Sequence, residues 1–248
     1  PHHLLGHVDP HDAYDVVQFA ADAHVAIDGI LTRGATPIVA GGSGLYLRAA
    51  LAELAFPPQV ASETRRRIRQ QVEELGPAAA HARLAAVDPE AAARIAPADV
   101  RRVVRALELA ELGESLVPAQ ADALWTTNVR HPTRLFGLQI DRPLVHARIN
   151  ERTPRLLDDG GIDEIETLLN DPRPLSHTAD RAHGLDDVRE LLAGRIGRAE
   201  CEERLSARTR QYAKRQDTWL RRLEQAELVD ANRPPDAVAA EIAERLQA

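Results

Sequence analysis

The sequence of 248 residues contains no methionine, one cysteine and few aromatic residues, which make up only 3% of the chain. A single cysteine, Cys201, excludes a disulfide within the chain and fits a reducing compartment. No run approaches the ~20 apolar residues that a membrane-spanning helix requires. No secretory signal, with a basic stretch followed by an apolar one, is readable at the N-terminus. These features favour a cytoplasmic protein without a membrane anchor.

The composition that remains is that of a globular protein. Hydrophobic residues make up 44% and charged residues 28% of the chain, which are ordinary values for such proteins. The scarcity of aromatics means that the core must be built from Leu, Val, Ile and Ala. The length suits one large domain, or one domain with an insertion.

The first part of the chain has the element order of an α/β protein. Apolar residues recur at helical spacing over residues 16–31, with Asp12 or Asp15 as a plausible cap and Gly34 after the end. The apolar run "TPIVAGG" (residues 36–42) is typical of a buried strand in a parallel sheet. Helical spacing resumes in "SGLYLRAALAEL". The sequence therefore predicts an α/β core with a parallel sheet.

A purely helical region interrupts this pattern between residues 56 and 129. Three amphipathic stretches follow one another there, and each is preceded by a cap-like residue: Ser62, Asp88 before Pro89, and Asp99. No strand pattern separates the three stretches. We therefore predict an all-helical insertion at residues 56–129 within a core formed by residues 1–55 and 130–248.

The chain then returns to the core. Residues 133–141 have the pattern of a strand, and a helix closed by Gly160 and Gly161 follows. A further helix is predicted at residues 162–171 and two more between residues 186 and 223. The segment "AELVD" (residues 226–230) favours a last edge strand before a terminal helix.

The loop "GGSGLY" (residues 41–46) could bind an anion, because glycines and a helix N-terminus expose backbone N–H groups. It lacks the Lys of a phosphate-binding Walker A loop, and the pattern taken alone favours a tight turn between strand and helix. The four histidines near the N-terminus match no zinc spacing, so no metal site is predicted from them; they are His2, His3, His7 and His11.

Cationic residues gather in several places although the formal net charge is -7. Arginine offers a planar fork that suits phosphate oxygens, and clustered cations are typical of nucleic-acid binding. A solvated helix face is the alternative for each group. Three groups are found: Arg65, Arg66, Arg67 and Arg69; Arg101, Arg102 and Arg105; and Arg208, Arg210, Lys214, Arg215, Arg221 and Arg222 around Trp219.

A fourth set of arginines lies on one face of a predicted helix. Arg148, Arg152 and Arg155 are spaced by four and three residues, so they share that face. One of them could hold a diphosphate. They could equally form surface ion pairs with Asp141 and Glu151, and the sequence pattern does not separate these alternatives.

Four quoted segments resemble the tRNA dimethylallyltransferase family, whose members prenylate N6 of adenosine 37, next to the anticodon. The segments are "PHHLLGHVDPHDAYDVVQF", "GATPIVAGGSGLYLRAALAEL", "DVRRVVRALEL" and "RTRQYAKRQDTWLRR". Their order and spacing agree with the family from residue 1 to about residue 223. The resemblance implies a P-loop-NTPase-like α/β core, dimethylallyl diphosphate as the donor, and a tRNA anticodon stem-loop as the partner. We expect a monomer, although no sequence feature determines the oligomeric state.

The resemblance also implies roles for individual residues. Ser43 matches a Thr that lines the tunnel where adenine meets the donor, and Arg152 matches an Arg that helps to bind the diphosphate. The residues that match tRNA-contacting positions are Arg65, Arg101, Arg102, Arg105, Arg181, Gly184, Lys214, Arg215, Gln216, Trp219 and Arg221.

The departures from the family are as informative as the matches. The family's P-loop, which holds the diphosphate and Mg²⁺, and its general-base Asp both precede the segment at residue 1. The resemblance implies that about 60 to 70 residues are missing, which is consistent with one βαβ unit and a loop. We therefore expect this chain alone to be an inactive fragment. Leu185 and Asp186 replace an aromatic and a basic residue of the family, which puts one tRNA contact in doubt.

Two other functions stay open. One is a prenyltransferase that acts on free adenine nucleotides, and the other is a non-catalytic RNA-binding paralogue. The helical insertion with its arginines favours tRNA over a free nucleotide.

Overall fold

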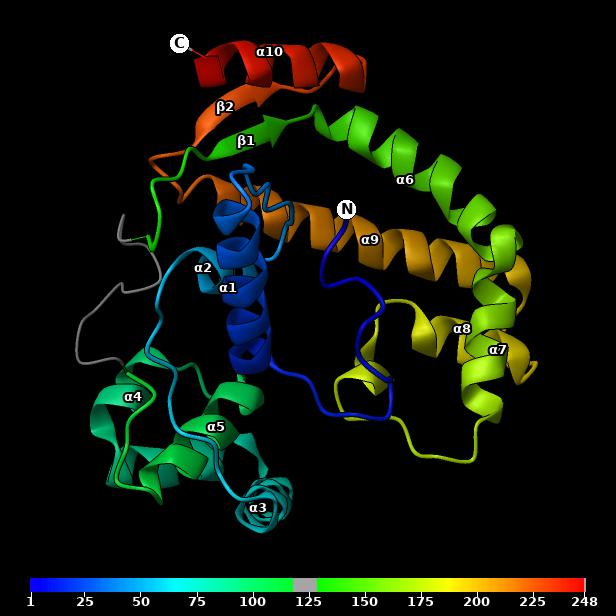
Figure 1. Cartoon of the computed structure of the whole chain (residues 1–248). Helices are drawn as coiled ribbons and strands as arrows, with labels where there is room; N and C mark the ends of the chain where they lie inside the picture. The colour runs from blue at the N-terminus through cyan, green and yellow to red at the C-terminus, as the bar shows by residue number, and fades with distance from the viewer. Residues whose placement is uncertain (118–128, 248) are drawn as a thin grey trace. The chain divides into compact units, whose positions relative to one another are not determined.

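The computed structural model describes residues 1–117 and 129–247, and the chain divides into two compact units. The first unit comprises Pro1–Glu53 and Thr127–Ala248, and the second comprises Leu54–Thr126. Figure 1 shows the elements of both units. Among the described residues, no helix is both long enough and apolar enough to cross a membrane.

The first unit begins with helices α1 (Val16–Thr32) and α2 (Gly44–Leu51). Asp15, rather than Asp12, caps α1: its carboxylate accepts hydrogen bonds from two backbone N–H groups, and the Gln18 side chain accepts from the Asp15 N–H in return. This reciprocal arrangement satisfies donors that a helix start otherwise leaves unpaired. Gly34 follows the helix with a φ of 71°, which confirms the predicted end.

The predicted strand at residues 36–42 is wrong. This segment forms no strand in the structure, and Ile38 is 89% exposed. An extended segment is stable as a strand only when its backbone N–H and C=O groups pair with a neighbouring strand. Within the described part of the chain, no segment pairs with residues 36–42, so its apolar composition alone does not make a strand.

The parallel sheet lies elsewhere in this unit. It consists of β1 (Phe136–Gln139) and β2 (Glu227–Asp230), paired in parallel with Phe136 opposite Glu227. Both strands were predicted from the sequence. Helix α10 (Pro235–Gln247) packs on one face, where Val229 is fully buried with Val238 (Figure 1).

The remaining helices of the first unit are α6 (Arg142–Leu156), α7 (Ile162–Asn170), α8 (Leu185–Leu192) and α9 (Arg198–Leu220), with a short 3-10 turn at Ala179–Arg181. Gly160 and Gly161 do not close the first of them as predicted. A π-helical segment, Leu157–Gly161, joins α6 directly to α7, and Gly160 reaches a φ of 103° there. Leu157, Val188, Cys201 and Leu205 form the core between these helices.

The second unit contains α3 (Ser62–Val87), α4 (Pro89–Arg94) and α5 (Val100–Ala110). Helix α3 is interrupted at Gly76, which has a non-helical φ of 76° and is followed by Pro77. Asp88 and Asp99 cap α4 and α5 as predicted, by accepting from backbone N–H groups. The prediction for Ser62 is wrong, because Ser62 is the first helical residue and Ala61 occupies the cap position.

The core of the second unit is apolar and aliphatic, as the low aromatic content requires. Ile68 and Leu84 of α3 are fully buried against Val103 and Leu107 of α5. The described residues of the second unit form no strand.

Candidate functional site

The glycine loop at residues 41–46 packs directly against α9. A Cβ atom added at Gly44 would lie 1.7 Å from Nε1 of Trp219, and one added at Gly42 would lie 1.8 Å from Nε2 of Gln216. Only glycine allows such a close approach. The loop is therefore a tight turn that brings Ser43 beside Gln216 and Trp219, which are residues far apart in the sequence.

Ser43 occupies the N-cap position of α2 but does not cap it. Its backbone is extended (φ -92°, ψ 111°), and its side chain makes no capping hydrogen bond. A serine at this position normally accepts a hydrogen bond from the first turn. The half-buried hydroxyl of Ser43 therefore remains available to a ligand at the helix N-terminus.

Arg152 lies on the exposed side of α6 and makes no ion pair with any described residue. The neighbouring Arg155 is 2.8 Å from Glu151, so the surface ion pair that the sequence allowed is made by Arg155. The next residue, Thr153, is buried and accepts a hydrogen bond of 3.1 Å from Ser206 of α9. This contact fixes the turn that carries Arg152 against α9.

The segments that carry Ser43 and Arg152 both pack against α9, but at different positions along its axis. The glycine loop packs at Gln216 and Trp219, and α6 packs at Ser206. Ser206 and Gln216 are ten residues apart on α9, which corresponds to about 15 Å along a helix axis. Neither of the two pockets found along this helix is lined by Ser43 or Arg152. The tunnel that the resemblance implies at Ser43, with the diphosphate near Arg152, therefore stays a prediction.

The first of these pockets has a volume of about 150 Å³, and the C-terminal part of α9 contributes Trp219 to its wall. Its lining is largely apolar, with Leu47, Leu51 and Leu223 among the residues. Arg48 also lines it and is only 3% exposed. Burial lowers the pKa of this guanidinium below its usual range.

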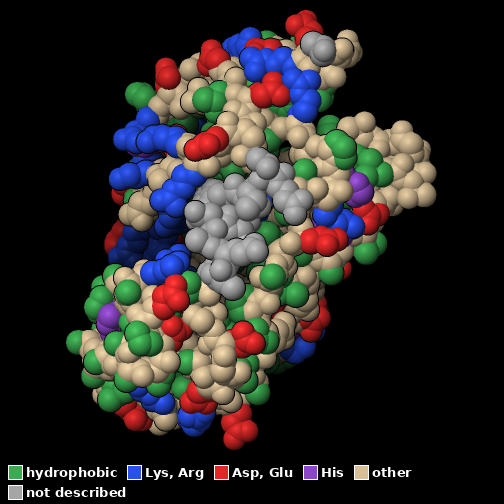
Figure 2. All heavy atoms as spheres, turned by 90° about the vertical axis from the view of Figure 1, so that its left-hand side faces the viewer, with side chains coloured by type: hydrophobic (Ala, Val, Ile, Leu, Met, Phe, Trp, Pro, Cys, Tyr) green, Lys and Arg blue, Asp and Glu red, His purple; other side chains and the backbone are tan. Residues whose placement is uncertain are grey.

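The second pocket is open, has a volume of about 320 Å³, and is lined mainly by cations. Lys214, Arg215, Thr218, Trp219 and Arg222 surround it. On the face drawn in Figure 2, Lys and Arg side chains of the molecule gather along the left-hand side and, among Asp and Glu, at the top.

The cations of α9 differ in their partners, and Arg208 lies 3.0 Å from Asp187 of α8. Arg198, Arg204, Arg210 and Arg221 each pair with a carboxylate on the same helix. These arginines fit the solvated helix face that the sequence left open. Lys214 and Arg215 are exposed and form no ion pair with a described residue, so their positive charge remains available to an anion.

The arginines of the second unit differ in the same way. Arg102 lies 3.7 Å from Asp99, and Arg105 lies 3.3 Å from Glu108 and donates to the Pro58 carbonyl. Arg65 and Arg101 form no ion pair within the described part of the chain. The local contacts of Arg102 and Arg105 are enough to explain their positions.

The segment that departs from the family packs into the core of the first unit. Gly184 has a φ of 89° and precedes α8, where Leu185 is 2% exposed. Asp186 pairs with Arg189 at 2.7 Å. Leu185 therefore serves packing, and Asp186 is neutralised locally. Arg181 is exposed and has no ion-pair partner among the described residues.

The N-terminal histidines contact protein groups. His7 is 3.2 Å from the Tyr14 hydroxyl, and His11 is 3.0 Å from the Pro174 carbonyl and 3.2 Å from Asp171. Among the residues that the structure describes, no group of three or more His, Cys, Asp or Glu side chains is arranged to hold a metal ion.

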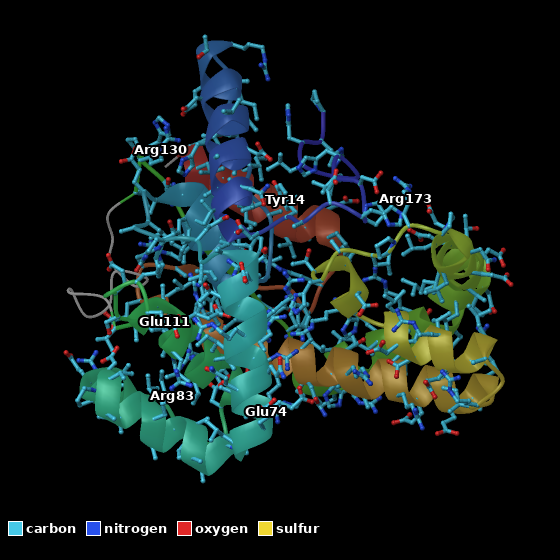
Figure 3. The ribbon with its side chains drawn as sticks, turned by 90° about the horizontal axis from the view of Figure 1, so that it is seen from below. Tyr14, Glu74, Arg83, Glu111, Arg130 and Arg173 are labelled. Carbon is cyan, nitrogen blue, oxygen red and sulfur yellow. The ribbon has the colours of Figure 1, made fainter. Side chains whose placement is uncertain are left out.

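One cluster was not predicted from the sequence. Arg130, labelled in Figure 3, and His131 both contact Asp28 of α1. Nη2 of Arg130 lies 2.9 Å and Nε2 of His131 lies 2.8 Å from the Asp28 carboxylate. The hydrogen bonds from Arg130 and then from His131 lower the pKa of Asp28. The separation of more than 100 residues left no periodic signal in the sequence that could have revealed this pairing.

A second charged cluster predicts how stability depends on pH. Arg173 lies 3.0 Å from Asp9 and 2.8 Å from Asp171 (Figure 3). The side-chain hydrogen bond from Arg173 lowers the pKa of Asp171; that of Asp9 is lowered by the His11 backbone N–H and then by Arg173. A carboxylate with a lowered pKa stabilises the fold above its unfolded pKa of about 3.9, and this contribution is lost as the pH falls through the folded pKa.

We therefore expect Arg173→Gln to lower the urea midpoint at neutral pH and to have a shrinking effect below about pH 4. The measurement is urea unfolding of both proteins from neutral to acidic pH. Arg148→Gln is the matched control, since Arg148 is exposed without an ion-pair partner among the described residues. An Arg173→Gln effect that persists unchanged in acid would contradict this assignment.

Comparisons with known proteins show which family this chain is similar to. The family model described as IPP transferase matches residues 1–223. The tRNA dimethylallyltransferase of Nocardioides sp. is 40% identical over 222 residues, which cover 90% of this chain and 71% of that protein. The enzyme of the same name from Thermomicrobium roseum is 38% identical over 238 residues, covering 94% of this chain and 70% of that protein.

Solved structures agree with these matches. The tRNA isopentenylpyrophosphate transferase of Bacillus halodurans is 30% identical and superposes with a TM-score of 0.66, covering 100% of this chain and 77% of that one. A eukaryotic dimethylallyltransferase acting on tRNA is 25% identical, with a TM-score of 0.72, and covers 98% and 63% of the two chains. The fold of this chain is therefore similar to the fold of these structures.

Proposed function

Because this chain belongs to the IPP transferase family, we propose that it acts in the transfer of a dimethylallyl group from dimethylallyl diphosphate to N6 of adenosine 37 in tRNA. The observation that carries this proposal is the match to the family over residues 1–223. Within that match, the hydroxyl of Ser43 and the guanidinium of Arg152 are both uncommitted among the described residues.

In the proposed reaction, the N6 lone pair of adenine attacks C1 of the donor, and the C1–O bond breaks. Its electron pair leaves with the diphosphate, and N6 gives up a proton to a base. The protein must align the two reactants, which supplies a large part of the rate enhancement. We assign Ser43 to positioning the adenine and Arg152 to stabilising charge on the leaving diphosphate.

Mg²⁺ bound by the family's P-loop would add positive charge near the diphosphate. The described residues of this chain contain no cluster arranged to hold it. We therefore assign no step of the reaction to a metal ion held by these residues. The proton acceptor is likewise not assigned to a residue of this chain.

We propose the anticodon stem-loop of tRNA as the partner, bound by a monomer in the cytoplasm. Lys214 and Arg215 beside the open pocket on α9, and Arg65 and Arg101 in the second unit, are cations without an ion-pair partner in the described structure. RNA phosphates would supply the negatively charged partners that these cations lack. Binding should then weaken as the salt concentration rises. The target base must leave its stack to reach N6.

The test is deletion of the coding sequence in the source organism, followed by mass spectrometry of nucleosides from total tRNA and from the free nucleotide pool. We expect N6-prenylated adenosine to disappear from tRNA and to return when the coding sequence is restored. Loss from free nucleotides alone would support the adenylate prenyltransferase instead. No change in either pool would support a non-catalytic RNA-binding protein.

A further inference from the structure

Two aromatic rings and a guanidinium meet at the surface where the segment before α8 lies against α9. The ring centroids of His183 and Tyr212 are 6.1 Å apart with an interplanar angle of 38°. The guanidinium carbon of Arg215 lies 5.6 Å from the Tyr212 ring centroid. All three side chains are exposed, and Tyr212 is 39% exposed. We call these three residues the stacking platform.

The charge around the stacking platform is positive. Arg215 and Lys214 have no ion-pair partner among the described residues, and Arg208 is close by on the same helix face. Asp187, the buried carboxylate in this region, is 1% exposed and lies 3.0 Å from Arg208, without hydrogen-bond geometry. The net effect is a cationic surface next to exposed π faces, which suits an unpaired nucleotide more than a peptide.

Hydrogen bonding determines which nitrogen of His183 is protonated. Nε2 lies 2.9 Å from the Thr209 hydroxyl, and that hydroxyl donates its own hydrogen to the Leu205 carbonyl at 2.8 Å. The hydroxyl oxygen can therefore only accept from Nε2–H. In the neutral ring Nδ1 is then an acceptor, and no described residue donates to it.

The neutral form of His183 is favoured by its surroundings. Burial, and then the nearby charge of Arg208, lower the pKa of His183. Arg215 acts in the same direction, while Asp187 opposes it. The acceptor at Nδ1 is therefore retained at neutral pH and becomes a donor only in acid.

We propose that the stacking platform binds one unpaired, amino-bearing nucleobase of an RNA, with the base stacked on Tyr212 and its exocyclic amine donating to Nδ1 of His183. This inference rests on the proposed function only in taking RNA as the ligand. It names a contact to a base, whereas Lys214 and Arg215 alone would supply contacts to phosphates. The base bound here is taken to be one other than the target adenine, because the exocyclic amine of that adenine is the reacting group.

The first test is the affinity of the full chain for a dye-labelled RNA hairpin with an unpaired loop, measured by fluorescence anisotropy at fixed salt. An RNA duplex with the same number of phosphates is the comparison. Tyr212→Leu is expected to weaken hairpin binding about tenfold, the typical cost of one lost base stack, and to leave duplex binding unchanged. Tyr212→Phe retains the ring and should bind the hairpin like the wild type.

The matched control for charge is Arg204→Gln. Arg204 lies on the same helix but pairs with Glu200, so its loss should change hairpin binding less than twofold. Arg215→Gln should weaken binding to both RNAs, because it removes a cation that either can use.

The second test concerns the acceptor at His183. Hairpins whose loops contain only cytosine or only uracil differ in the exocyclic amine. The wild type should bind the cytosine loop several-fold more tightly, and His183→Phe, which keeps a ring but has no acceptor, should bind both loops equally.

Equal hairpin affinity of Tyr212→Leu and Tyr212→Phe would overturn the stacking platform. A wild type that does not prefer the hairpin to the duplex would do the same. Neither result would contradict the proposed function, which is tested by the amount of prenylated adenosine in cellular tRNA. Conversely, unchanged tRNA modification after gene deletion would leave the hairpin measurements intact.

Discussion

Replacing Gly44 by alanine is expected to destabilise the first unit by about 2 kcal/mol. The added Cβ would lie 1.7 Å from Nε1, 1.8 Å from Cε2 and 2.3 Å from Cδ2 of Trp219. The indole is rigid, so the contact can be relieved only by moving α2 or the whole Trp219 side chain. Overpacking of this kind costs about 3 kcal/mol, while the better helix propensity of alanine returns at most about 1 kcal/mol.

The measurement is urea unfolding followed by circular dichroism, with Gly41→Ala as the matched control. Gly41 lies in the same loop, but nothing is within 4 Å of a Cβ at that position, so its substitution should be neutral or slightly stabilising. The double variant Gly44→Ala with Trp219→Leu should lose less stability than the two single variants added together. Equal effects of the Gly41 and Gly44 substitutions would show that the loop does not pack on α9 as described.

Arg152→Gln is expected to lower the rate of prenyl transfer about 10²–10³-fold. Removing one preorganised group that stabilises developing charge typically costs this much. Because Arg152 is exposed and makes no ion pair with a described residue, the substitution should leave the unfolding free energy nearly unchanged. The rate is measured with labelled dimethylallyl diphosphate and tRNA, using the protein produced from the coding sequence.

Arg148→Gln separates a specific role from a general effect of charge. Arg148 lies one turn away on the same helix, is also exposed, and has no ion-pair partner in the described structure. Its replacement should change the rate only a few-fold. If the two variants were equally active, the assignment of Arg152 to the diphosphate would be wrong.

The order of the helices could be predicted because each carries local signals. Asp88 and Asp99 precede α4 and α5, and apolar residues recur at helical spacing after them. Such signals act within one or two turns, so the surrounding fold does not alter them. The four motifs that led to the family are likewise continuous stretches of sequence.

Two failed predictions are local, namely the cap at Ser62 and the helix end at Gly160 and Gly161. The failed strand depends on a distant partner. Residues 36–42 have the composition of a buried strand, but a strand exists only if another backbone pairs with it.

The sequence analysis also did not separate the cations of α9. Arg210 is 2.6 Å from Glu203, seven residues earlier on the same helix. Lys214 has Ala207 at the corresponding position and no described ion-pair partner.

Local sequence alone was therefore enough for most of the helices, for the caps at Asp88 and Asp99, and for the family, since these depend on residues a few positions apart. The packing of Gly44 against Trp219, the pairing of Asp28 with Arg130, and the meeting of His183 with Tyr212 depend on segments that come together only in the folded chain. Chain folding makes these contacts through space, and no periodicity in the sequence encodes them.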